Sequence, residues 1–416
     1  MSEARDRMRR VVEKSTQVVV MSAIVGVVTG FGVAGFERIV VDGLLDHIER
    51  QPLWVVALAP TIGLLLSLIA LRLLGGGMSP ATSDEYLRAF HNPGISLTLR
   101  GLAARMTAAI STLGFGGAMG LEGPSLYLGA TAGAQTQRRF PGLFRGADRR
   151  LLMVAGAAAG VSAIFKAPAT GAIFAIEVPY QDDLARRMLL PALVASASGY
   201  LAFVAVNGTA RLFPVAGEPT FNFRDLVGAL ALGVAAGLAA RAFSAMVLKA
   251  KSIAAWRSVL RPLLAGAALA TIFGASRLAT GQDLTLGPGY NTIAWAVEEN
   301  HSLWLVALIL VLRCTATAAT VGGGGAGGLF IPLVVGGALT GRLVGGAVQS
   351  LDTTLFVVIG VAAFLGAGYR VPLAAVMFVA ETTGRPGFVV PGLLAAVAAE
   401  LTMGRGSITS YQSAAG

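Results

Sequence analysis

Three short segments of the sequence combine glycine with proline in a pattern suited to binding an anion. They cover residues 75–80, 120–124 and 328–332, and each stands at the start of an apolar run. Proline is favoured in the first turn of a helix, and glycine before it permits a tight turn, so each segment predicts a helix N-terminus. Such an end presents unpaired N–H groups and about half a positive charge, which favours anions.

One helix end cannot hold an anion inside an apolar protein by itself. The idealised desolvation of a small ion costs on the order of 20 kcal/mol, whereas a favourable helix dipole returns about 2 kcal/mol at most. The sequence therefore predicts that several of these N-termini converge, helped by hydroxyl groups or by retained water.

Glu122 places a carboxylate inside the second of these segments. A carboxylate within a glycine-rich apolar stretch is costly, so it is a functional hypothesis by default. At a helix N-terminus, Glu122 would occupy the site that a free anion needs and would leave it on protonation. It could thus gate anion movement or couple it to protons. The alternative is a first-turn glutamate that only complements the helix dipole.

The composition indicates a membrane protein. The chain has 416 residues, of which 13% are charged and 55% hydrophobic, and 54 are glycine. A typical soluble domain has about 25% charged residues. This composition argues against a soluble enzyme, a disordered scaffold and a nucleic-acid binder, although the net charge of +10 would otherwise suggest nucleic acid.

Metal, disulfide and hydrolytic chemistry find little support in the sequence. Cys314 is the single cysteine, which rules out an intramolecular disulfide, and His47, His91 and His301 show no metal-ligand spacing. No nucleophile, histidine and acid form a recognisable set. We therefore expect no metal, no cofactor and no enzymatic activity.

Apolar runs divide the chain into candidate membrane helices. A spanning helix needs about 20 apolar residues, and the runs at 15–36, 51–71 and 188–210 reach that length without a charge. The first run is too long for a signal peptide and predicts a retained helix. Other runs are short or interrupted and predict broken or tilted helices: residues 225–240, 262–276, 302–312, 353–369 and 386–399.

The two halves of the chain resemble each other. A shift of 208 residues lays one half on the other, with these matches among others: Arg105, Thr112, Gly120 and Pro124 on Arg313, Thr320, Gly328 and Pro332. A shift of 204 residues continues the match: Lys166, Pro168, Phe174 and Glu177 on Arg370, Pro372, Phe378 and Glu381. Chance similarity between glycine-rich helices is the alternative. We predict a duplication, with a first repeat at 1–215 and a second at 216–416.

Charge indicates that the two repeats are inverted. Residues 137–150 carry five arginines, whereas the matching stretch 341–354 carries one basic residue and one acid: Arg138, Arg139, Arg145, Arg149 and Arg150 against Arg342 and Asp352. By the positive-inside rule, the first loop is cytoplasmic and the second is not. In inverted repeats, substrate sites lie near the membrane midplane, where broken helices of both halves meet.

These motifs resemble those of the CLC family of chloride channels and chloride/proton antiporters, over about residues 16–412. Residues 76–80 are similar to the family's GSGIP-like turn, residues 120–124 to its GREGP-like turn with the gating glutamate, and residues 328–332 to its GxFxP turn. Tyr411 is similar to its late tyrosine. The resemblance implies an all-α polytopic membrane protein with two inverted repeats of tilted and broken helices.

The resemblance also implies site residues and partners. By it, Glu122 is the gate, the anion site includes Gly123 and the backbone amides of Phe330 and Ile331, and the Tyr411 hydroxyl donates to a central anion. It further implies a homodimer with an anion pathway in each subunit, an interface formed by residues 168–207 and 372–404, and a position in the cell's inner membrane with both termini in the cytoplasm.

The sequence departs from the family pattern in two anion-binding turns. Leu121 stands where the family has arginine beside the gate, which weakens the positive field there. The serine of the first turn is missing: an alignment on Pro80 puts Gly77 at its place, and a one-residue gap puts Met78 there. Ser79 could substitute. A methionine here also resembles the fluoride-exporting branch, so the choice between chloride and fluoride stays open.

A third departure concerns protons. Family antiporters often carry two adjacent acids at the positions that correspond to residues 177 and 178, and the second acid relays protons from inside. Glu177 matches the first, but Val178 stands at the second, and valine cannot carry a proton. This favours a channel, or an exchanger with another proton route. Because Glu381 is the repeat partner of Glu177, we expect both to be structural acids at helix ends.

The sequence thus predicts a membrane anion transporter of the CLC type, a chloride channel or a chloride/proton antiporter. The alternative within the family is a fluoride/proton antiporter. The alternative of another class is a membrane binding or assembly protein that transports nothing. The predicted partners are chloride or fluoride, protons in the case of an antiporter, the lipid bilayer and a second copy of the chain, with no nucleic acid.

Overall fold

The computed structural model describes residues 2–144, 147–210, 212–213, 221–254, 258–298, 301–348 and 353–414. Helices form most of this part of the chain, and its only extended pairings are two isolated bridges. The prediction of an all-α fold is confirmed. The predicted boundary near residue 215, Arg145 and Asp352 lie outside the described residues.

The helices of the first half run from α1 to α9: α1 Ser2–Arg38, the π-helical η1 Ile39–Leu45, α2 Asp46–Glu49, α3 Leu53–Leu73, α4 Ser83–His91, α5 Leu99–Gly114, α6 Glu122–Arg139, α7 Leu151–Phe165, α8 Pro168–Glu177, η2 Arg186–Met188 and α9 Leu189–Asn207. The helices of the second half run from α10 to α17: α10 Phe223–Ala254, α11 Leu260–Thr280, α12 Tyr290–Val297, α13 Leu303–Gly322, α14 Phe330–Ala347, α15 Thr353–Tyr369, α16 Pro372–Thr383, η3 Pro386–Phe388 and α17 Val389–Met403.

Eight helical segments of the described chain are long and apolar enough to cross a membrane. The first covers Thr16–Glu49, and the others fall on α3, α9, α10, α11, α13, α14 and α17. The protein is therefore a multi-pass integral membrane protein. Shorter apolar helices, among them α7 and α16, fill the space between the long ones.

Three of the predicted short runs are wrong in length. The runs at 225–240, 262–276 and 302–312 belong to continuous helices of 32, 21 and 20 residues, α10, α11 and α13. The prediction stopped at charged residues, whereas the helices continue through them. Arg313 shows how a helix tolerates the charge: its buried guanidinium donates to the backbone carbonyls of the turn at residues 284–288.

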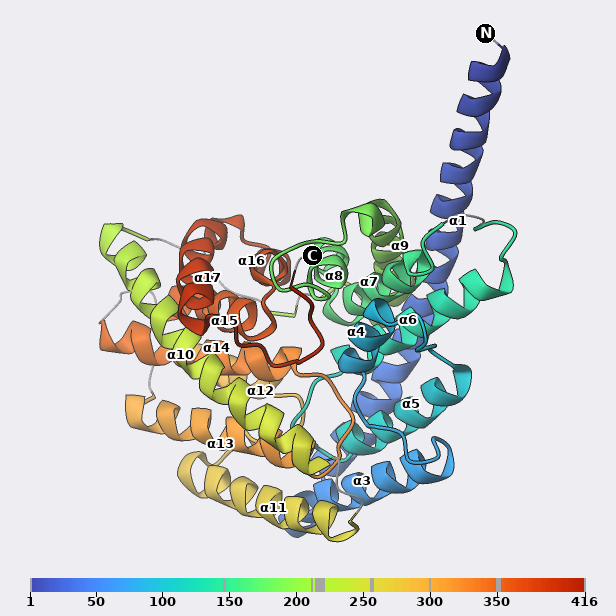
Figure 1. Ribbon diagram of the computed structural model, residues 1–416. Coiled ribbons are helices and arrows are strands. Elements are labelled where there is room, and N and C mark those ends of the chain that lie inside the picture. The colour runs from blue at the N-terminus through green and yellow to red at the C-terminus, as the bar shows by residue number, and fades with distance from the viewer. Residues whose placement is uncertain are drawn as a thin grey trace.

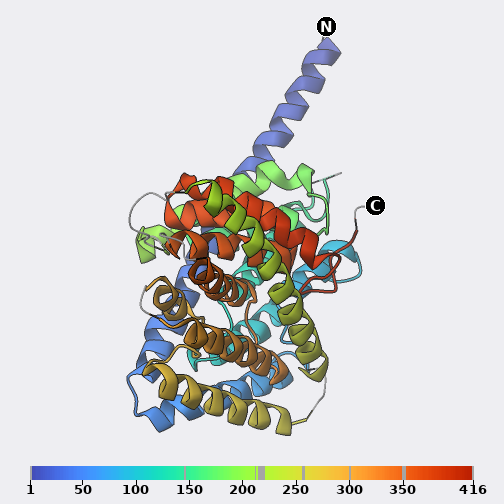
Figure 2. The same cartoon turned by 90° about the vertical axis from the view of Figure 1, so that its left-hand side faces the viewer.

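The helices lie in two groups that follow the two halves of the sequence. In Figure 1, most helices of the first half (blue to green) lie on the right and most of the second half (yellow to red) on the left. In the first group α1 packs against α7 and α9, and in the second α10 packs against α15 and α17. The N-terminal part of α1 projects beyond the body of the protein, as Figure 2 also shows.

Glycines let neighbouring helices approach until their backbones touch. A Cβ atom on Gly133 of α6 would lie 1.8 Å from the carbonyl oxygen of Leu152 on α7. In the second half, a Cβ on Gly341 of α14 would lie 2.0 Å from the carbonyl oxygen of Phe356 on α15. Such approach is how membrane helices gain packing energy without a hydrophobic driving force between them. It accounts for many glycines that lie far from any anion-binding turn.

Contacts between the two halves are reciprocal at their shared core. The Thr112 hydroxyl oxygen accepts from the amide of Ala326 at 3.0 Å, and the Thr320 hydroxyl oxygen accepts from the amide of Ala118 at 3.1 Å. The acceptors lie 208 residues apart in sequence, as do the donors. When residue i of one unit contacts residue j of the other and the reverse also holds, a two-fold axis relates the units.

The predicted helix-end acids obey the same reciprocity. The two oxygens of Glu177, at the end of α8, accept from the amides of Leu373 and Ala374 in the first turn of α16, at 3.1 and 2.8 Å. The oxygens of Glu381, in α16, accept from the amides of Ala169 and Thr170 in the first turn of α8, at 2.9 and 2.7 Å. Each acid therefore caps the other repeat's helix, as expected of structural acids.

The arginine-rich loop after α6 is partly fixed to its neighbours. Arg149 donates to the carbonyls of Ala89 and Phe90 at the end of α4, at 3.0 and 3.2 Å. Arg150 pairs with Asp148 at 2.6 Å, and its hydrogen bonds lower the pKa of that carboxyl. These arginines stabilise the loop in addition to any role in membrane orientation.

Candidate functional site

Two of the three glycine and proline segments begin helices as predicted, and those helices meet. Helix α6 begins at Glu122 and α14 begins at Phe330. The segments just before them pair in antiparallel fashion, with Gly120 N donating to Gly328 O at 2.9 Å and Gly328 N donating to Gly120 O at 2.7 Å. The positive ends of two 18-residue helices, one from each half, thus converge.

The first segment does not begin a helix, so that prediction is wrong. Helix α4 starts at Ser83, beyond Pro80, and it is a short polar helix, not the start of an apolar run. The physical reason is that Gly76 and Gly77 adopt φ values of 63° and 83°. This left-handed backbone extends the turn after α3, so residues 75–80 present an irregular loop instead of a helix N-terminus.

Glu122 occupies the point where the two helix ends meet. Its side chain is buried, with 3% of its surface exposed, although it lies at the N-terminus of α6. Oε1 accepts from the amide of Phe330 at 2.6 Å and lies 3.4 Å from the amide of Ile331. Oε2 is buried and has no hydrogen-bond partner among the described residues. The carboxylate therefore holds one strong bond and one unsatisfied oxygen, an arrangement that favours its release once the charge is removed.

Glycines leave the room that this carboxylate fills. A Cβ on Gly120 would lie 1.9 Å from Oε2 of Glu122, and a Cβ on Gly328 would lie 2.1 Å from Oε1. Gly123 packs equally closely, since a Cβ there would lie 2.6 Å from the Thr82 hydroxyl oxygen. The three glycines form a cradle that accepts a carboxylate or an anion of similar size, but no additional side chain.

Aromatic rings enclose the cradle on the side of Phe330. The ring of Phe330 packs on those of Phe165, Phe174 and Phe378, with centroids 4.4, 5.3 and 4.9 Å apart. These rings come from α7, α8 and α16. They exclude water from the Phe330 amide, so its bond to Glu122 lies in a low-dielectric environment where it is strong.

A cavity of about 640 Å³ leads toward this cradle. Four predicted anion-site residues line it, Gly77, Met78, Ser79 and Tyr411, and so does Leu329, the residue before Phe330. The cavity therefore reaches the start of α14. The predicted site residues fall into two groups: Gly123, Phe330 and Ile331 surround Glu122, while the other four border the cavity.

The cavity wall carries more basic than acidic side chains, and two of the basic ones form ion pairs. Its basic side chains are Arg72, Arg88, Lys251 and Arg261, and its acids are Asp84 and Glu85. Lys251 lies 2.7 Å from Asp84, and Arg88 lies 3.0 Å from Glu85. The wall thus carries an excess of positive charge, which attracts anions into the cavity.

Two predicted ligands of a central anion have specific positions in this cavity. The Ser79 hydroxyl accepts from the amide of Ala81 at 3.2 Å, and its own carbonyl accepts from buried Arg105 at 3.2 Å. Tyr411 is 44% exposed, and its ring lies 5.7 Å from the Arg88 guanidinium. Tyr411 therefore stands at an open part of the wall.

Val178 lies in the loop that follows α8 and is buried. Its carbonyl accepts from the Gln412 side-chain amide at 3.0 Å, and that amide also donates to the Tyr369 carbonyl at 2.6 Å.

The described part of the chain contains no group of three His, Cys, Asp or Glu residues placed to hold a metal ion.

Sequence reasoning missed two residues of this region. Tyr369 ends α15, is buried and lines the cavity, but nothing in its sequence surroundings distinguishes it from a packing aromatic. Glu400 lies within α17, in a membrane-spanning segment. The predicted run ended at residue 399 because an acid follows, and a search for acids inside apolar helices would have found it.

Comparison with known proteins gives consistent matches over nearly the whole chain. Residues 63–404 match the family described as voltage gated chloride channel. A ClcB-like protein of Ralstonia nicotianae is 28% identical, covering 87% of this chain and 85% of that protein. The H(+)/Cl(-) exchange transporter ClcA of Salmonella paratyphi B is 26% identical, covering 95% and 88%. The crystal structure of a CLC-type fluoride/proton antiporter shares the fold, with a TM-score of 0.82, 21% identity and coverage of 96% and 98%.

Proposed function

The chain belongs to the voltage-gated chloride channel family, the CLC family, and we propose that it exchanges chloride for protons across a membrane with Glu122 as the protonatable gate. The observation that carries this proposal is the bond from the Phe330 amide to Glu122 Oε1, 2.6 Å long and buried at the junction of two helix N-termini. The carboxylate occupies the position that an anion needs.

The gate works by competition between two negative groups. While Glu122 is charged, it holds the Phe330 amide and repels an approaching anion. Protonation removes that charge, weakens the bond to the amide and frees the cradle for chloride. Flux should therefore rise as the pH falls. Each proton that Glu122 takes up on one side and gives up on the other is also available for exchange.

The cavity supplies the path on one side of the gate. Its excess of basic side chains draws chloride in, and the loop with Gly77, Met78 and Ser79 and the Tyr411 hydroxyl offer polar groups along the way. Leu121 stands beside the gate where the family has arginine. The positive field at Glu122 therefore comes from helix ends and not from an adjacent cation.

Proton coupling is favoured over a channel by the relatives and opposed by one residue. The ClcA relative, which covers 95% of this chain, is named an H(+)/Cl(-) exchange transporter. Val178, in contrast, removes the second acid on which family antiporters often rely. Exchange then requires another carboxylate on that side of the protein. A channel is the alternative if none serves.

Fluoride is the second candidate substrate, and Met78 is the observation that favours it. Met78 borders the cavity in the turn where chloride-selective members carry serine. A thioether offers no hydrogen-bond donor to chloride. Selectivity therefore depends on whether Ser79 and Tyr411 can replace the missing donor.

The proposal is tested by reconstituting the purified protein in liposomes and measuring chloride efflux, fluoride efflux and internal pH together. We expect chloride efflux that moves protons in the opposite direction. Faster fluoride than chloride efflux would identify the fluoride antiporter instead, and chloride efflux without proton movement would identify a channel. Efflux of neither ion would support a membrane assembly protein that transports nothing and would contradict the proposal.

We further propose that the two halves, 1–215 and 216–416, are inverted repeats with both termini on the cytoplasmic side of the inner membrane. The reciprocal contacts of Thr112 with Thr320's segment and of Glu177 with Glu381's helix support a two-fold relation between them. Reporter proteins fused to either terminus are expected to show that the terminus lies in the cytoplasm. Activity of either fusion on the outer side would contradict this orientation.

A homodimer is supported by matching apolar faces on α9 and α17. Leu201 and Leu401, 200 residues apart, are 63% and 79% exposed. Leu190 and Val390, near the starts of the same two helices, are also exposed and also lie 200 residues apart. Family resemblance assigns the interface to these segments. We expect cross-linking in membranes to capture dimers and Leu401→Arg to abolish them, because a charge at an apolar interface lacks a partner. The matched control is Leu278→Arg, which alters a fully exposed leucine of α11. Capture of monomers alone from the unaltered protein would contradict the dimer.

A further inference from the structure

Glu400 is an acid inside a membrane-spanning helix that the gate mechanism does not use. It lies in the segment Pro386–Met403, and its side chain is 22% exposed. Oε1 lies 3.2 Å from a guanidinium nitrogen of Arg370. Oε2 is buried and has no hydrogen-bond partner among the described residues. A buried carboxylate oxygen without a donor is costly, so an acid in this position is a candidate for proton binding.

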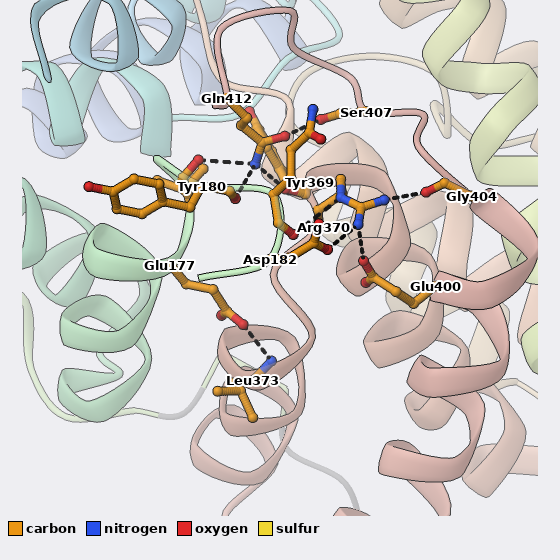
Figure 3. A network of polar contacts seen from close by, with 12 residues as sticks. Glu177, Tyr180, Asp182, Tyr369, Arg370, Leu373, Glu400, Gly404, Ser407 and Gln412 are labelled. Carbon is orange, nitrogen blue, oxygen red and sulfur yellow. Dashed lines mark hydrogen bonds and ion pairs between the residues drawn. The ribbon is translucent and has the colours of Figure 1, made fainter. Parts of the chain in front are cut away.

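Arg370 connects Glu400 to a carboxylate at the surface. Its guanidinium is 7% exposed, and Figure 3 shows it between Asp182 and Glu400. The nitrogen that contacts Glu400 also lies 2.5 Å from Oδ1 of Asp182, whose side chain is 66% exposed. Because both carboxylate oxygens lie within 3.2 Å of the same nitrogen, one water molecule can bridge them. A proton can thus pass between the solution and the Glu400 carboxylate.

A third carboxylate, that of Glu177, interacts with this pair. Glu177 ends α8 and interacts electrostatically with Glu400. Among the described residues, the charged side chains that interact with Glu400 are Arg370 beside α15, Asp182 in the loop after α8, and Glu177. Two carboxylates thus contact one cation, and the charge of Glu177 adds to the negative charge that acts on Glu400, so a proton bound in this cluster reduces the excess negative charge.

The way from this cluster to the gate crosses one layer of rings. Phe174, one turn before Glu177 on α8, packs on Phe330 with centroids 5.3 Å apart. The Phe330 amide in turn holds Glu122. These rings separate the carboxylates of the cluster from that of Glu122. A proton can therefore cross the layer only if water enters it during turnover.

We propose that Glu400 takes up and releases the exchanged proton at the end of the protein that carries Asp182, in place of the carboxylate that Val178 lacks. The proton leaves a hydronium ion or the Asp182 carboxyl, passes through the bridging water and forms an O–H bond to the Glu400 carboxylate. It then moves toward Glu122 through water that enters the ring layer, and the route runs in reverse for release. This inference rests on the proposed exchange of chloride for protons.

Glu400 could also have a purely structural role, and the experiment must distinguish that role from proton transfer. Arg370 donates to the carbonyls of Gln181 and Gly404, and so ties the end of α17 to the loop after α8. If Glu400 only held Arg370 in place for this purpose, its replacement would lower the stability and both fluxes together. Loss of proton movement alone is a change that a merely structural acid would not produce.

The test compares Glu400→Gln with the unaltered protein in liposomes. We expect chloride efflux close to that of the unaltered protein, with proton movement reduced to that of protein-free vesicles, and partial recovery of protons in Glu400→Asp. The matched control is Glu37→Gln, which alters the acid that faces Lys166, the repeat partner of Arg370, and should keep the proton-to-chloride ratio. An unchanged ratio in Glu400→Gln would overturn the inference while leaving the proposed function intact. Chloride movement without protons in the unaltered protein would overturn it too.

A second measurement does not depend on transport. Infrared difference spectra of the purified protein between acid and alkaline pH report protonated carboxyl groups, and we expect Glu400→Gln to remove one carboxyl band that Glu37→Gln retains. Retention of every band in Glu400→Gln would overturn the inference even if the protein transported no anion. Failure of the proposed function would appear separately, as absent chloride efflux.

Discussion

Replacement of Glu122 by glutamine is expected to give chloride flux that no longer depends on pH and that moves no protons. Glutamine keeps the size of the side chain but carries no charge and cannot take up a proton. The bond from the Phe330 amide, 2.6 Å long in the present structure, loses its charge assistance. Chloride can then compete for the amide at every pH, so flux at neutral pH should approach that of the unaltered protein in acid.

The measurement is chloride efflux from liposomes across a range of pH, with internal pH recorded at the same time. Glu381→Gln is the matched control, because Glu381 also accepts bonds from two amides in the first turn of a helix, at 2.9 and 2.7 Å, but lies away from the cavity. It should lower stability and keep the pH dependence. A Glu122→Gln protein that keeps the pH dependence of the unaltered protein would show that another group gates the anion.

The sequence was sufficient to predict that Glu122 lies at a helix N-terminus, because the signals for this position are local. Glycine and proline next to Glu122 and Phe330 determine where α6 and α14 begin, and the repeat shift of 208 residues placed the two segments in equivalent positions. What it could not predict is that Gly120 and Gly328 pair directly. That pairing depends on the packing of whole helices, and so does the choice of the Phe330 amide as the partner of Oε1.

The errors have equally physical causes. Counting uncharged residues shortened α10, α11 and α13, because a buried arginine such as Arg313 can be satisfied by backbone carbonyls without leaving its helix. The same rule ended the last run before Glu400. The first glycine segment was predicted to begin a helix, but the left-handed backbone of Gly76 and Gly77 is a choice that glycine permits and sequence alone does not determine.

The structure also shows how two kinds of glycine serve different purposes. Glycines such as Gly133 remove side chains between helix backbones, whereas Gly120 removes a side chain from the space that the Glu122 carboxylate fills. Substitution at the first kind should damage packing. Substitution at the second kind should act on the gate itself, because the atoms it would displace belong to a side chain and not to the backbone.

Gly120→Ala is therefore expected to raise chloride flux at neutral pH and to weaken its pH dependence. The three atoms nearest a Cβ at this position all belong to the Glu122 carboxyl group, at 1.9, 2.6 and 2.7 Å, so the side chain must rotate away from the Phe330 amide. A hydrogen bond to a charged group is worth about 1.5–3 kcal/mol, so the carboxylate should occupy the cradle roughly ten to a hundred times less often. Gly120 is not among the glycines with positive φ, so alanine fits its backbone.

Efflux at neutral pH checks this expectation, with Gly35→Ala as the control because a Cβ there meets no atom within 4 Å. The double variant Gly120→Ala/Glu122→Gln extends the test. If alanine acts only by displacing the carboxylate, then the double variant should show the pH-independent chloride flux of Glu122→Gln, and the effects of the two changes should not add. Additive effects would mean that alanine alters the cradle for chloride directly. Neutral-pH flux no higher than that of Gly35→Ala would mean that the carboxylate keeps its place at the Phe330 amide despite the added methyl group.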